Sequence, residues 1–220
     1  MYWTDEGYLL SKNNFDENSI IIEAFTLNHG KYNGIVYGGA SRKNKKNFQT
    51  GNKILLNWKS KNENKYGYFN IELIKPIAPI YFEDKKRTAC ILSATSILKI
   101  LLPERQINKK IYDSFDKMIN SLDKNNWIDL YIYWELNLIK ELGYELNFLI
   151  KDKKNFENFI EINKRKFKIP QMYININQSE NNSYKIKEAL VFNKNLLIEN
   201  FISPNNLKFP LFRNLLENYY

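Results

Sequence analysis

The 220-residue sequence contains one cysteine, Cys90, and one histidine, His29. A single thiol excludes an internal disulfide bond and a zinc site built from clustered cysteines, so we expect no metal. His29 lies in an Asn-His-Gly stretch that is typical of a turn, where a lone histidine is usually a polar loop residue. We therefore expect neither a catalytic cysteine nor a catalytic histidine.

Enzyme motifs are missing as well. The sequence has no P-loop GxxxxGK[ST], no GxGxxG and no GxSxG. Its carboxylates show no spacing that would converge on a metal ion, and Glu135 and Glu141 are interpreted as the solvated surface of a helix. The sequence therefore predicts a protein that is not an enzyme and that needs no cofactor.

Long apolar runs are absent too. The longest, residues 89–102, is shorter than a membrane-spanning helix and contains Lys99. The first eight residues, MYWTDEGY, include acids and no apolar core of a signal peptide. We expect no membrane partner and a cytoplasmic location.

Acidic residues are missing from one long stretch, between Gly30 and Asn62. The same stretch contains a cluster of four cations, the cationic loop: Arg42, Lys43, Lys45 and Lys46. The formal net charge of +9 is unevenly distributed, at +4 for residues 1–80, zero for 81–147 and +5 for 148–220. Abundant lysine and asparagine, as expected from an AT-rich coding sequence, make the total weak evidence. The distribution is better evidence and indicates localised basic surfaces.

The first 80 residues read as five short strands rich in Ile, Leu, Tyr and Phe. Turn-forming Asn and Gly clusters separate them, and they are predicted at 7–11, 19–26, 31–38, 53–60 and 66–74. Five short strands indicate a small barrel, for which the OB-fold is the natural candidate. An SH3-like barrel and a small sandwich are the alternatives.

After Pro76 and Pro79 the apolar period changes from two to 3.6. Three amphipathic helices, a short hairpin and two further helices are predicted, at 91–102, 111–122, 127–142, 159–169, 184–202 and 209–220. The predicted fold class is therefore α+β. It comprises an N-terminal five-stranded OB-fold barrel, residues 1–79, followed by an α-helical domain, residues 80–220.

Cations and aromatic residues alternate across the predicted barrel, as in proteins that bind nucleic acid. Lysine and arginine bind phosphates by releasing condensed counterions, and bases stack on aromatic rings. We interpret the cationic loop as a phosphate contact, because no nearby acid neutralises it. Lys31, Lys59 and Trp58 are further candidate nucleic-acid contacts, with Trp58 as a stacking residue. Alternate strand residues face inward, so about two of five barrel aromatics should be available to stack. The five are Tyr32, Tyr37, Trp58, Tyr66 and Tyr68.

A second basic cluster, comprising Lys164, Arg165, Lys166 and Lys168, falls on the predicted hairpin. It either extends the nucleic-acid-binding surface or forms the polar face of the hairpin, and both alternatives stay open. The first three of these residues are included as candidate nucleic-acid contacts.

Several segments resemble the RecO family of bacterial recombination and repair mediators. They are WTDEGYLLS, HGKYNGIVYGGASRK and TGNKILLNW in the predicted barrel, and LLPERQINKKIYDSF, YIYWELNLIKELGYEL and EALVFNKNLLIENFISPNN in the helical part. The resemblance covers nearly the whole chain, and the alphaproteobacterial variant is the most similar. Arg42 and Lys43 match the family's basic cluster best.

The resemblance implies an OB-fold followed by helices, and binding to single- and double-stranded DNA. It also implies annealing of complementary strands and, with RecR, loading of RecA onto DNA coated by single-strand-binding protein, whose C-terminal tail is a partner. We expect an apolar groove with basic edges for that tail, a nucleoid association, and RecF and RecA as indirect partners.

Many relatives carry a four-cysteine zinc module, but no cysteine follows Tyr144 here. Residues 146–182 are interpreted as a reduced remnant of that module. The alternatives to the RecO reading are an RNA-binding OB-fold protein and a protein scaffold without annealing activity.

Overall fold

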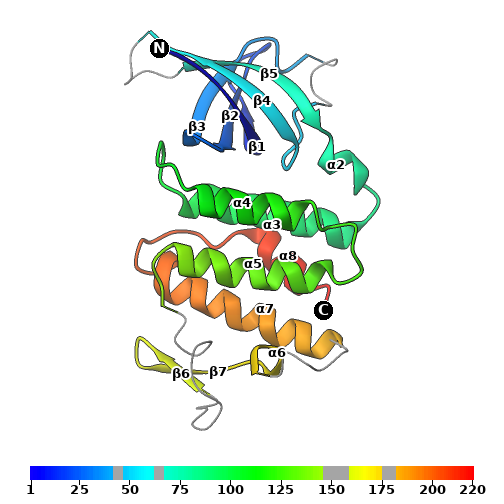
Figure 1. The fold of residues 1–220 in the computed structure, drawn as a ribbon, viewed down its shortest axis with the longest axis vertical. Coiled ribbons are helices and arrows are strands. Elements are labelled where there is room, and N and C mark those ends of the chain that lie inside the picture. The colour runs from blue at the N-terminus through cyan, green and yellow to red at the C-terminus, as the bar shows by residue number, and fades with distance from the viewer. Residues whose placement is uncertain (42–46, 62–66, 146–158, 175–181) are drawn as a thin grey trace. The chain divides into compact units, whose positions relative to one another are not determined.

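The computed structural model describes residues 1–41, 47–61, 67–145, 159–174 and 182–220 (Figure 1). The chain divides into two compact units, residues 1–112 with 210–213 and residues 113–209 with 214–220. This division rests on contacts between residues and does not test whether residues 1–79 fold alone. The expected domain boundary between residues 79 and 80 therefore stays a prediction.

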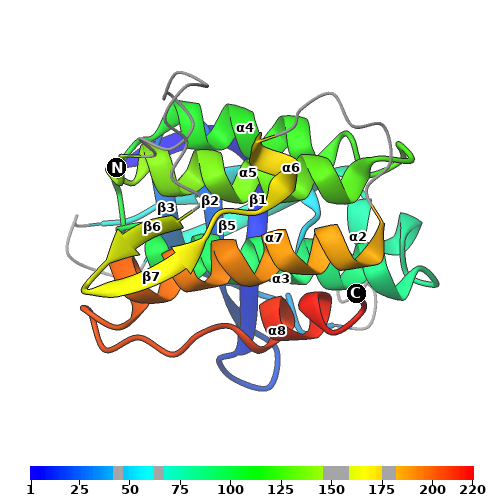
Figure 2. The ribbon, with the colours of Figure 1, turned by 90° about the horizontal axis from the view of Figure 1, so that it is seen from below.

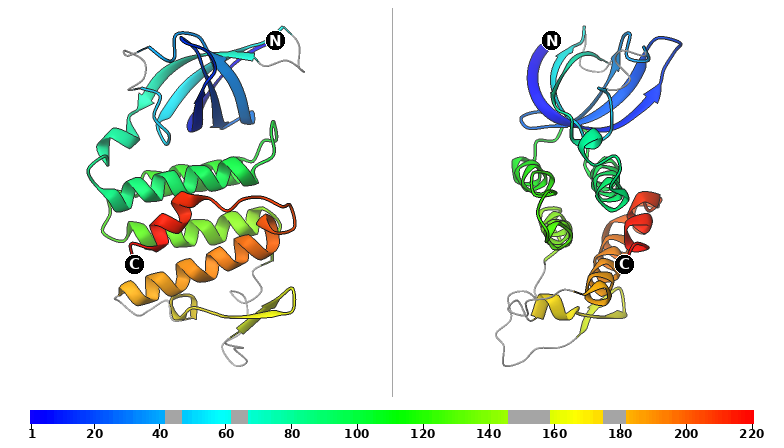
Figure 3. Two further views of the ribbon diagram at one scale, coloured as in Figure 1. Left: turned by 180° about the vertical axis from the view of Figure 1, so that it is seen from behind. Right: turned by 90° about the vertical axis from the view of Figure 1, so that its right-hand side faces the viewer.

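The first unit contains five strands that curl into a closed barrel (Figure 3). The strands are β1 (Tyr2–Asn14), β2 (Ile20–Thr26), β3 (Gly30–Val36), β4 (Lys53–Lys59) and β5 (Gly67–Lys75). They follow the order β1-β2-β3-β5-β4, and β1 closes the barrel against β4. Five strands in this order form an OB-fold barrel. The predicted α+β class and the barrel are confirmed.

The barrel core follows from alternation along the strands. Even-numbered residues of β4 face inward, and Ile54, Leu56 and Trp58 are at most 3% exposed. Gly34 and Gly67 pair directly where β3 and β5 run parallel. A Cβ atom at Gly67 would lie 2.3 Å from Nε1 of Trp58, so glycine lets the large core rings fill this seam.

Helices follow the barrel within the same unit. They are α2 (Ile77–Ile80), α3 (Lys85–Leu101) and the start of α4 (Lys109–Ile119). The side chain of Asp84 caps α3 by accepting a hydrogen bond from the backbone N–H of Arg87 at 3.0 Å. Helix α3 packs against β1, which places it directly beside the barrel (Figure 1).

The second unit is mainly helical. It contains the rest of α4 and helix α5 (Trp127–Glu141), which packs along α7 (Ser183–Leu197) (Figure 2). Two short strands form the predicted hairpin, with Asn163 and Lys164 in left-handed conformations at its turn. The hairpin strands are β6 (Phe159–Ile162) and β7 (Arg165–Lys168). The remaining elements are α6 (Gln171–Ile174), the π-helix η2 (Ile198–Ile202) and α8 (Leu211–Glu217), which begins in the first unit.

One sequence interpretation of α5 is wrong. Glu135 is fully buried, not part of a solvated surface. Its carboxylate accepts hydrogen bonds from the hydroxyl of Tyr131 at 2.6 Å and from Nδ2 of Asn193 at 3.2 Å, and Tyr173 in turn donates to Asn193 at 2.8 Å. These partners replace the water that an exposed carboxylate would bind. None of the helices in the described parts of the chain combines the length and apolar composition that a bilayer crossing requires.

Candidate nucleic-acid interface

The cationic loop, Arg42, Lys43, Lys45 and Lys46, lies outside the described residues, but both of its ends are described. On the upstream side, the backbone N–H groups of Gly39, Ala40 and Ser41 donate to carbonyls of Val36, Asn18 and Gly38 at 3.2–3.3 Å. These bonds fix the point at which the chain leaves β3.

The downstream end of the loop is anchored by Asn52, which is fully buried. Its Nδ2 donates to the carbonyl of Asn47 at 3.0 Å, and its Oδ1 accepts from the backbone N–H of Ala78 at 2.9 Å. Phe48, just after the loop, belongs to the barrel core. The loop therefore leaves and rejoins the barrel at two fixed points.

Two tyrosines lie on the outside of the barrel near the upstream end of the loop. Tyr37 directly follows β3 and is 64% exposed. Its ring centroid lies 5.7 Å from that of Tyr68 on β5, with the ring planes 51° apart. The cationic loop thus begins beside a pair of outward-facing aromatic rings.

Strand register places Tyr68 in a line of outward-facing residues on neighbouring strands, the outer row. Tyr2 on β1 pairs with Lys59 on β4, and Lys59 pairs with Tyr68. Tyr68 pairs in turn with Ile35 on β3, and Ile35 with Ile21 on β2. Directly opposed residues have Cβ atoms about 4.5–5.5 Å apart, so the row forms a continuous stripe.

The other predicted stacking residues do not lie on this stripe. Trp58 is 3% exposed and belongs to the barrel core, so its ring is not available to stack on a base. Tyr32 faces inward and packs against the same core. Tyr66 lies outside the described residues.

The two predicted barrel lysines have opposite surroundings. Lys59 is exposed on the outer row, and no described carboxylate lies within ion-pair distance of it. Lys31 is half-buried, and its ammonium group donates to the carbonyl of Lys99 on α3 at 2.6 Å. Burial lowers the pKa of Lys31, although Glu23 and Glu104 oppose the shift. Lys31 therefore attaches α3 to the barrel.

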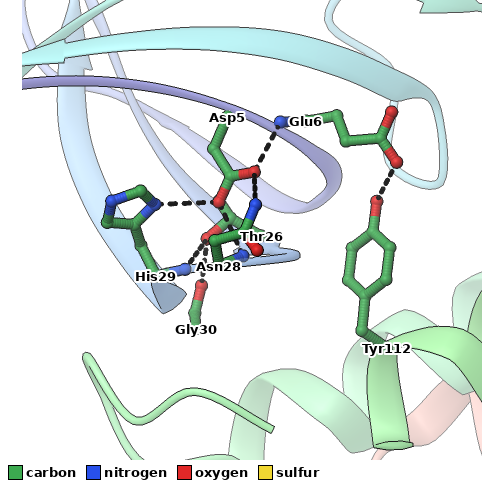
Figure 4. Close-up of polar contacts among 7 residues, drawn as sticks. All are labelled: Asp5, Glu6, Thr26, Asn28, His29, Gly30 and Tyr112. Atoms are coloured by element: carbon green, nitrogen blue, oxygen red, sulfur yellow. Dashed lines mark hydrogen bonds and ion pairs between the residues drawn. The ribbon is translucent and has the colours of Figure 1, made fainter. Parts of the chain in front are cut away.

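Helix α3 and the start of α4 cover part of the outer surface of β1–β3. Lys99 forms an ion pair with Glu23 on β2 at 3.0 Å. The ring of Tyr112 packs on Phe25 with centroids 5.5 Å apart, and its hydroxyl donates to Glu6 at 3.2 Å (Figure 4). Phe25 is 1% exposed as a result.

Sequence reasoning missed a polar network around Asp5 (Figure 4). The buried carboxylate accepts from the backbone N–H groups of Glu6 and Asn28 at 2.9 and 2.7 Å, and from Nδ2 of Asn28 at 3.0 Å. Nδ1 of His29 lies 2.8 Å from it, and the imidazole stacks on Trp3 with centroids 4.1 Å apart. The network fixes the turn between β2 and β3, in keeping with the interpretation of His29 as a turn residue.

The second basic cluster lies together on the β6–β7 hairpin. Arg165 forms an ion pair with Glu199 at 2.5 Å, and Lys168 pairs with Glu188 at 3.4 Å. Lys164 and Lys166 are exposed and form no ion pair with any described residue. Two cations therefore attach the hairpin to the helical unit, while the other two remain accessible.

The helical unit also contains a cavity of about 330 Å³ between β7 and α7. Its lining combines apolar and aromatic side chains with two lysines, one acid and one amide: Phe167, Lys168, Tyr184, Lys187, Glu188, Val191, Phe192 and Asn195. Among the residues that the structure describes, no three Cys, His, Asp or Glu side chains are placed to hold a metal ion.

Comparison with known proteins identifies both parts of the chain. Residues 1–77 match the family model "Recombination protein O N terminal", and residues 83–149 match "Recombination protein O C terminal". "DNA repair protein RecO" of Cereibacter sphaeroides is 34% identical over 147 residues, covering 67% of this chain and 61% of the relative. The protein of the same name from Roseobacter denitrificans is 33% identical over 147 residues, covering 66% and 61%.

The matched region thus spans about three fifths of the length of these relatives. The two family models cover the barrel and the segment that contains helices α3 to α5, in the order in which this chain has them. The chain belongs to the RecO family of DNA repair proteins.

Proposed function

We propose that this chain is a non-enzymatic DNA-binding mediator of recombination repair. In this role it binds single- and double-stranded DNA, anneals complementary strands, and with RecR helps to load RecA onto DNA coated by single-strand-binding protein. It works in the cytoplasm at the nucleoid. The observation that carries the proposal is the attachment of both described ends of the cationic loop to an OB-fold barrel. Near the upstream end, the exposed ring of Tyr37 packs on the half-buried ring of Tyr68.

Annealing sets an electrostatic requirement. Two phosphate backbones repel each other, so a mediator must neutralise both strands at once. The chain carries cations on each of its two units: the cationic loop and Lys59 on the barrel, and Lys164 and Lys166 on the hairpin. Each of these two groups of cations could neutralise the phosphates of one DNA strand.

The cavity beside α7 fits the proposed protein partner. An acidic peptide with an apolar end would place its apolar side chains against Phe167 and Phe192. Its carboxylates would lie near Lys187, because the other lysine of the lining, Lys168, is already paired with Glu188. The C-terminal tail of single-strand-binding protein is the occupant we propose. Lys187→Glu should weaken binding of that peptide without changing binding to DNA.

The central test replaces Arg42, Lys43, Lys45 and Lys46 by alanine. Fluorescence anisotropy with labelled single-stranded DNA should show weaker binding to every sequence, and the salt dependence should flatten by about one unit per lost phosphate contact. A matched variant removes four exposed lysines elsewhere: Lys109, Lys117, Lys124 and Lys140. It should bind nearly as the wild type does. Equal losses in the two variants would refute a specific role for the loop.

The same measurement separates the alternatives. An RNA-binding protein would prefer labelled RNA to DNA, and a scaffold would bind the acidic peptide but neither nucleic acid. A strand-annealing assay with complementary oligonucleotides adds the last criterion. Binding without acceleration of annealing would contradict the mediator role.

A further inference from the structure

The surface that usually binds ligands in an OB-fold is partly occupied in this chain. OB-folds bind oligonucleotides on the face of strands 2 and 3. Here Lys99 of α3 contacts that face through its ion pair with Glu23 and through its carbonyl, which accepts from Lys31. Further along β3, Nδ2 of Asn33 donates to Glu104 at 2.9 Å. A strand of nucleic acid therefore cannot cross this part of the face.

The outer row lies elsewhere on the barrel surface: Tyr2 and Lys59 are exposed, and Tyr68, Ile35 and Ile21 are half-buried. At one end the row continues from Ile21 to Asn13 on β1, and at the other end it reaches Tyr2 on the same strand. These two positions on β1 are eleven residues apart, so the row winds obliquely around the barrel. From Tyr2 to Ile35 it spans three strand spacings, about 14 Å, which is about four bases at a stacked rise of about 3.4 Å.

The rings on this row are held in place. The hydroxyl of Tyr2 donates to Oδ1 of Asn57 at 3.2 Å and accepts from Thr4 at 3.1 Å, although the residue is 68% exposed. Tyr37 and Tyr68 support each other. Exposed rings with little rotational freedom are suited to stacking, because less conformational entropy is lost on binding.

The charge on the row is small and positive. Lys59 lies between Tyr2 and Tyr68, and the row contains no carboxylate. The nearest acid on β5 is Glu72, four residues beyond Tyr68. One cation among three tyrosines supplies a single phosphate contact, so most of the binding energy from this surface must come from ring stacking.

We infer that the outer row together with Tyr37 stacks the unpaired bases of a single strand, so that the chain binds single-stranded DNA more tightly than duplex DNA. The inference rests on the DNA binding proposed above and assigns the discrimination to a surface distinct from the cationic loop. Bases in a duplex have their faces covered by neighbouring pairs, so the tyrosines gain nothing from them. Phosphate contacts, in contrast, serve both forms.

The test is the full chain carrying Tyr37→Ala and Tyr68→Ala together. Anisotropy is measured with three labelled probes: an oligothymidylate, an abasic strand of the same length and a hairpin duplex. Binding to the oligothymidylate should weaken about tenfold, while binding to the other two should change less than about twofold. The salt dependence should stay that of the wild type, because no cation is removed.

Two matched variants guard against loss of folding. Tyr37→Phe with Tyr68→Phe keeps the rings and should retain the preference for the oligothymidylate over the abasic strand. Phe82→Ala removes an aromatic ring that is 78% exposed between α2 and α3, and this variant should bind as the wild type does. Thermal unfolding by circular dichroism checks that every variant is folded.

The outcomes separate the two claims. If the wild type binds DNA and the double alanine variant keeps its preference for bases, the stacking row is wrong while the DNA-binding function stands. Equal weakening on the oligothymidylate and the abasic strand also refutes the row. If the wild type binds none of the probes, both claims fail.

Discussion

At the scale of single residues, the direction in which a strand side chain points decides what it can do. Trp58 and Lys59 are neighbours on β4, yet the first lies in the core and the second on the outer row. The sequence predicts that about two of the five barrel aromatics are available to stack. It also contained the signal to reject Trp58, because Ile54, Leu56 and Trp58 share one parity.

Asp5 allows a prediction about stability. Asp5→Ala leaves the backbone N–H groups of Glu6 and Asn28 without their acceptor and removes the partner of His29. Because water cannot reach these buried N–H groups to replace the lost acceptor, we expect the free energy of unfolding to fall by about 2–4 kcal/mol. Urea denaturation followed by circular dichroism measures it.

Asp16 provides the control for this variant. Its carboxylate also accepts from two backbone N–H groups, of Asn18 at 2.8 Å and Ser19 at 2.6 Å, and the bond from Asn18 is the main cause of a lowered pKa. It lies in an exposed turn, where water can replace it. A larger loss for Asp16→Ala than for Asp5→Ala would contradict the role of burial.

At the scale of elements, period and turn residues predict most of the fold. Strands β2 to β5, helices α4 and α5 and the hairpin are confirmed close to their expected bounds. Strand β1, predicted at 7–11, spans Tyr2–Asn14, and helix α3, predicted at 91–102, already begins at Lys85. The four-residue helices α2 and α6 were not predicted, because one helical turn is too short to show a period. Register was also beyond the sequence, so the line from Tyr2 to Ile21 emerged only from the structure.

A close approach between β3 and the segment after α3 provides a prediction at this scale. The backbone N–H of Arg105 donates to the carbonyl of Lys31 at 2.8 Å, and a Cβ atom at Gly30 would lie 2.2 Å from the carbonyl oxygen of Gln106. Gly30 also has a φ of +76°. Gly30→Ala should therefore lower the free energy of unfolding by about 2–4 kcal/mol, measured in urea.

Gly38 isolates the contribution of this clash. Its φ of +69° resembles that of Gly30, but a Cβ atom there would have no neighbour within 4 Å. Gly38→Ala should cost about 1–2 kcal/mol, from backbone strain alone. If the two variants lose the same stability, the packing of residues 104–106 on β3 is not what requires glycine at position 30.

At the scale of the whole molecule, family resemblance gives the order of barrel and helices, and the family matches agree with it. The sequence does not indicate which helices form one compact unit with the barrel. Helix α3 and the start of α4 belong to the same compact unit as the barrel, through Lys99, Tyr112 and their partners. A change of period marks where strands end, but not which helices the barrel needs.

Two fragments test that need. A fragment of residues 1–79 lacks the cover that Tyr112 gives to Tyr8 and Phe25, which are 0% and 1% exposed in the full chain. A fragment of residues 1–112 keeps it. The shorter fragment should aggregate or unfold at lower temperature, because it exposes these rings. Light scattering and thermal unfolding compare the two, and equal behaviour would support a folding boundary at residue 79.

The helix lying on one side of the barrel has a practical consequence for genetics. Substitutions on the covered side, at Glu23 or Phe25, should act through protein abundance in the cell and, under the proposed function, reduce DNA binding and annealing together. Substitutions at Tyr37 or Tyr68 on the open side should leave abundance intact and yield separation-of-function alleles. Under the proposed function, substitutions on one side of the barrel therefore change its stability, and substitutions on the other side change DNA binding alone.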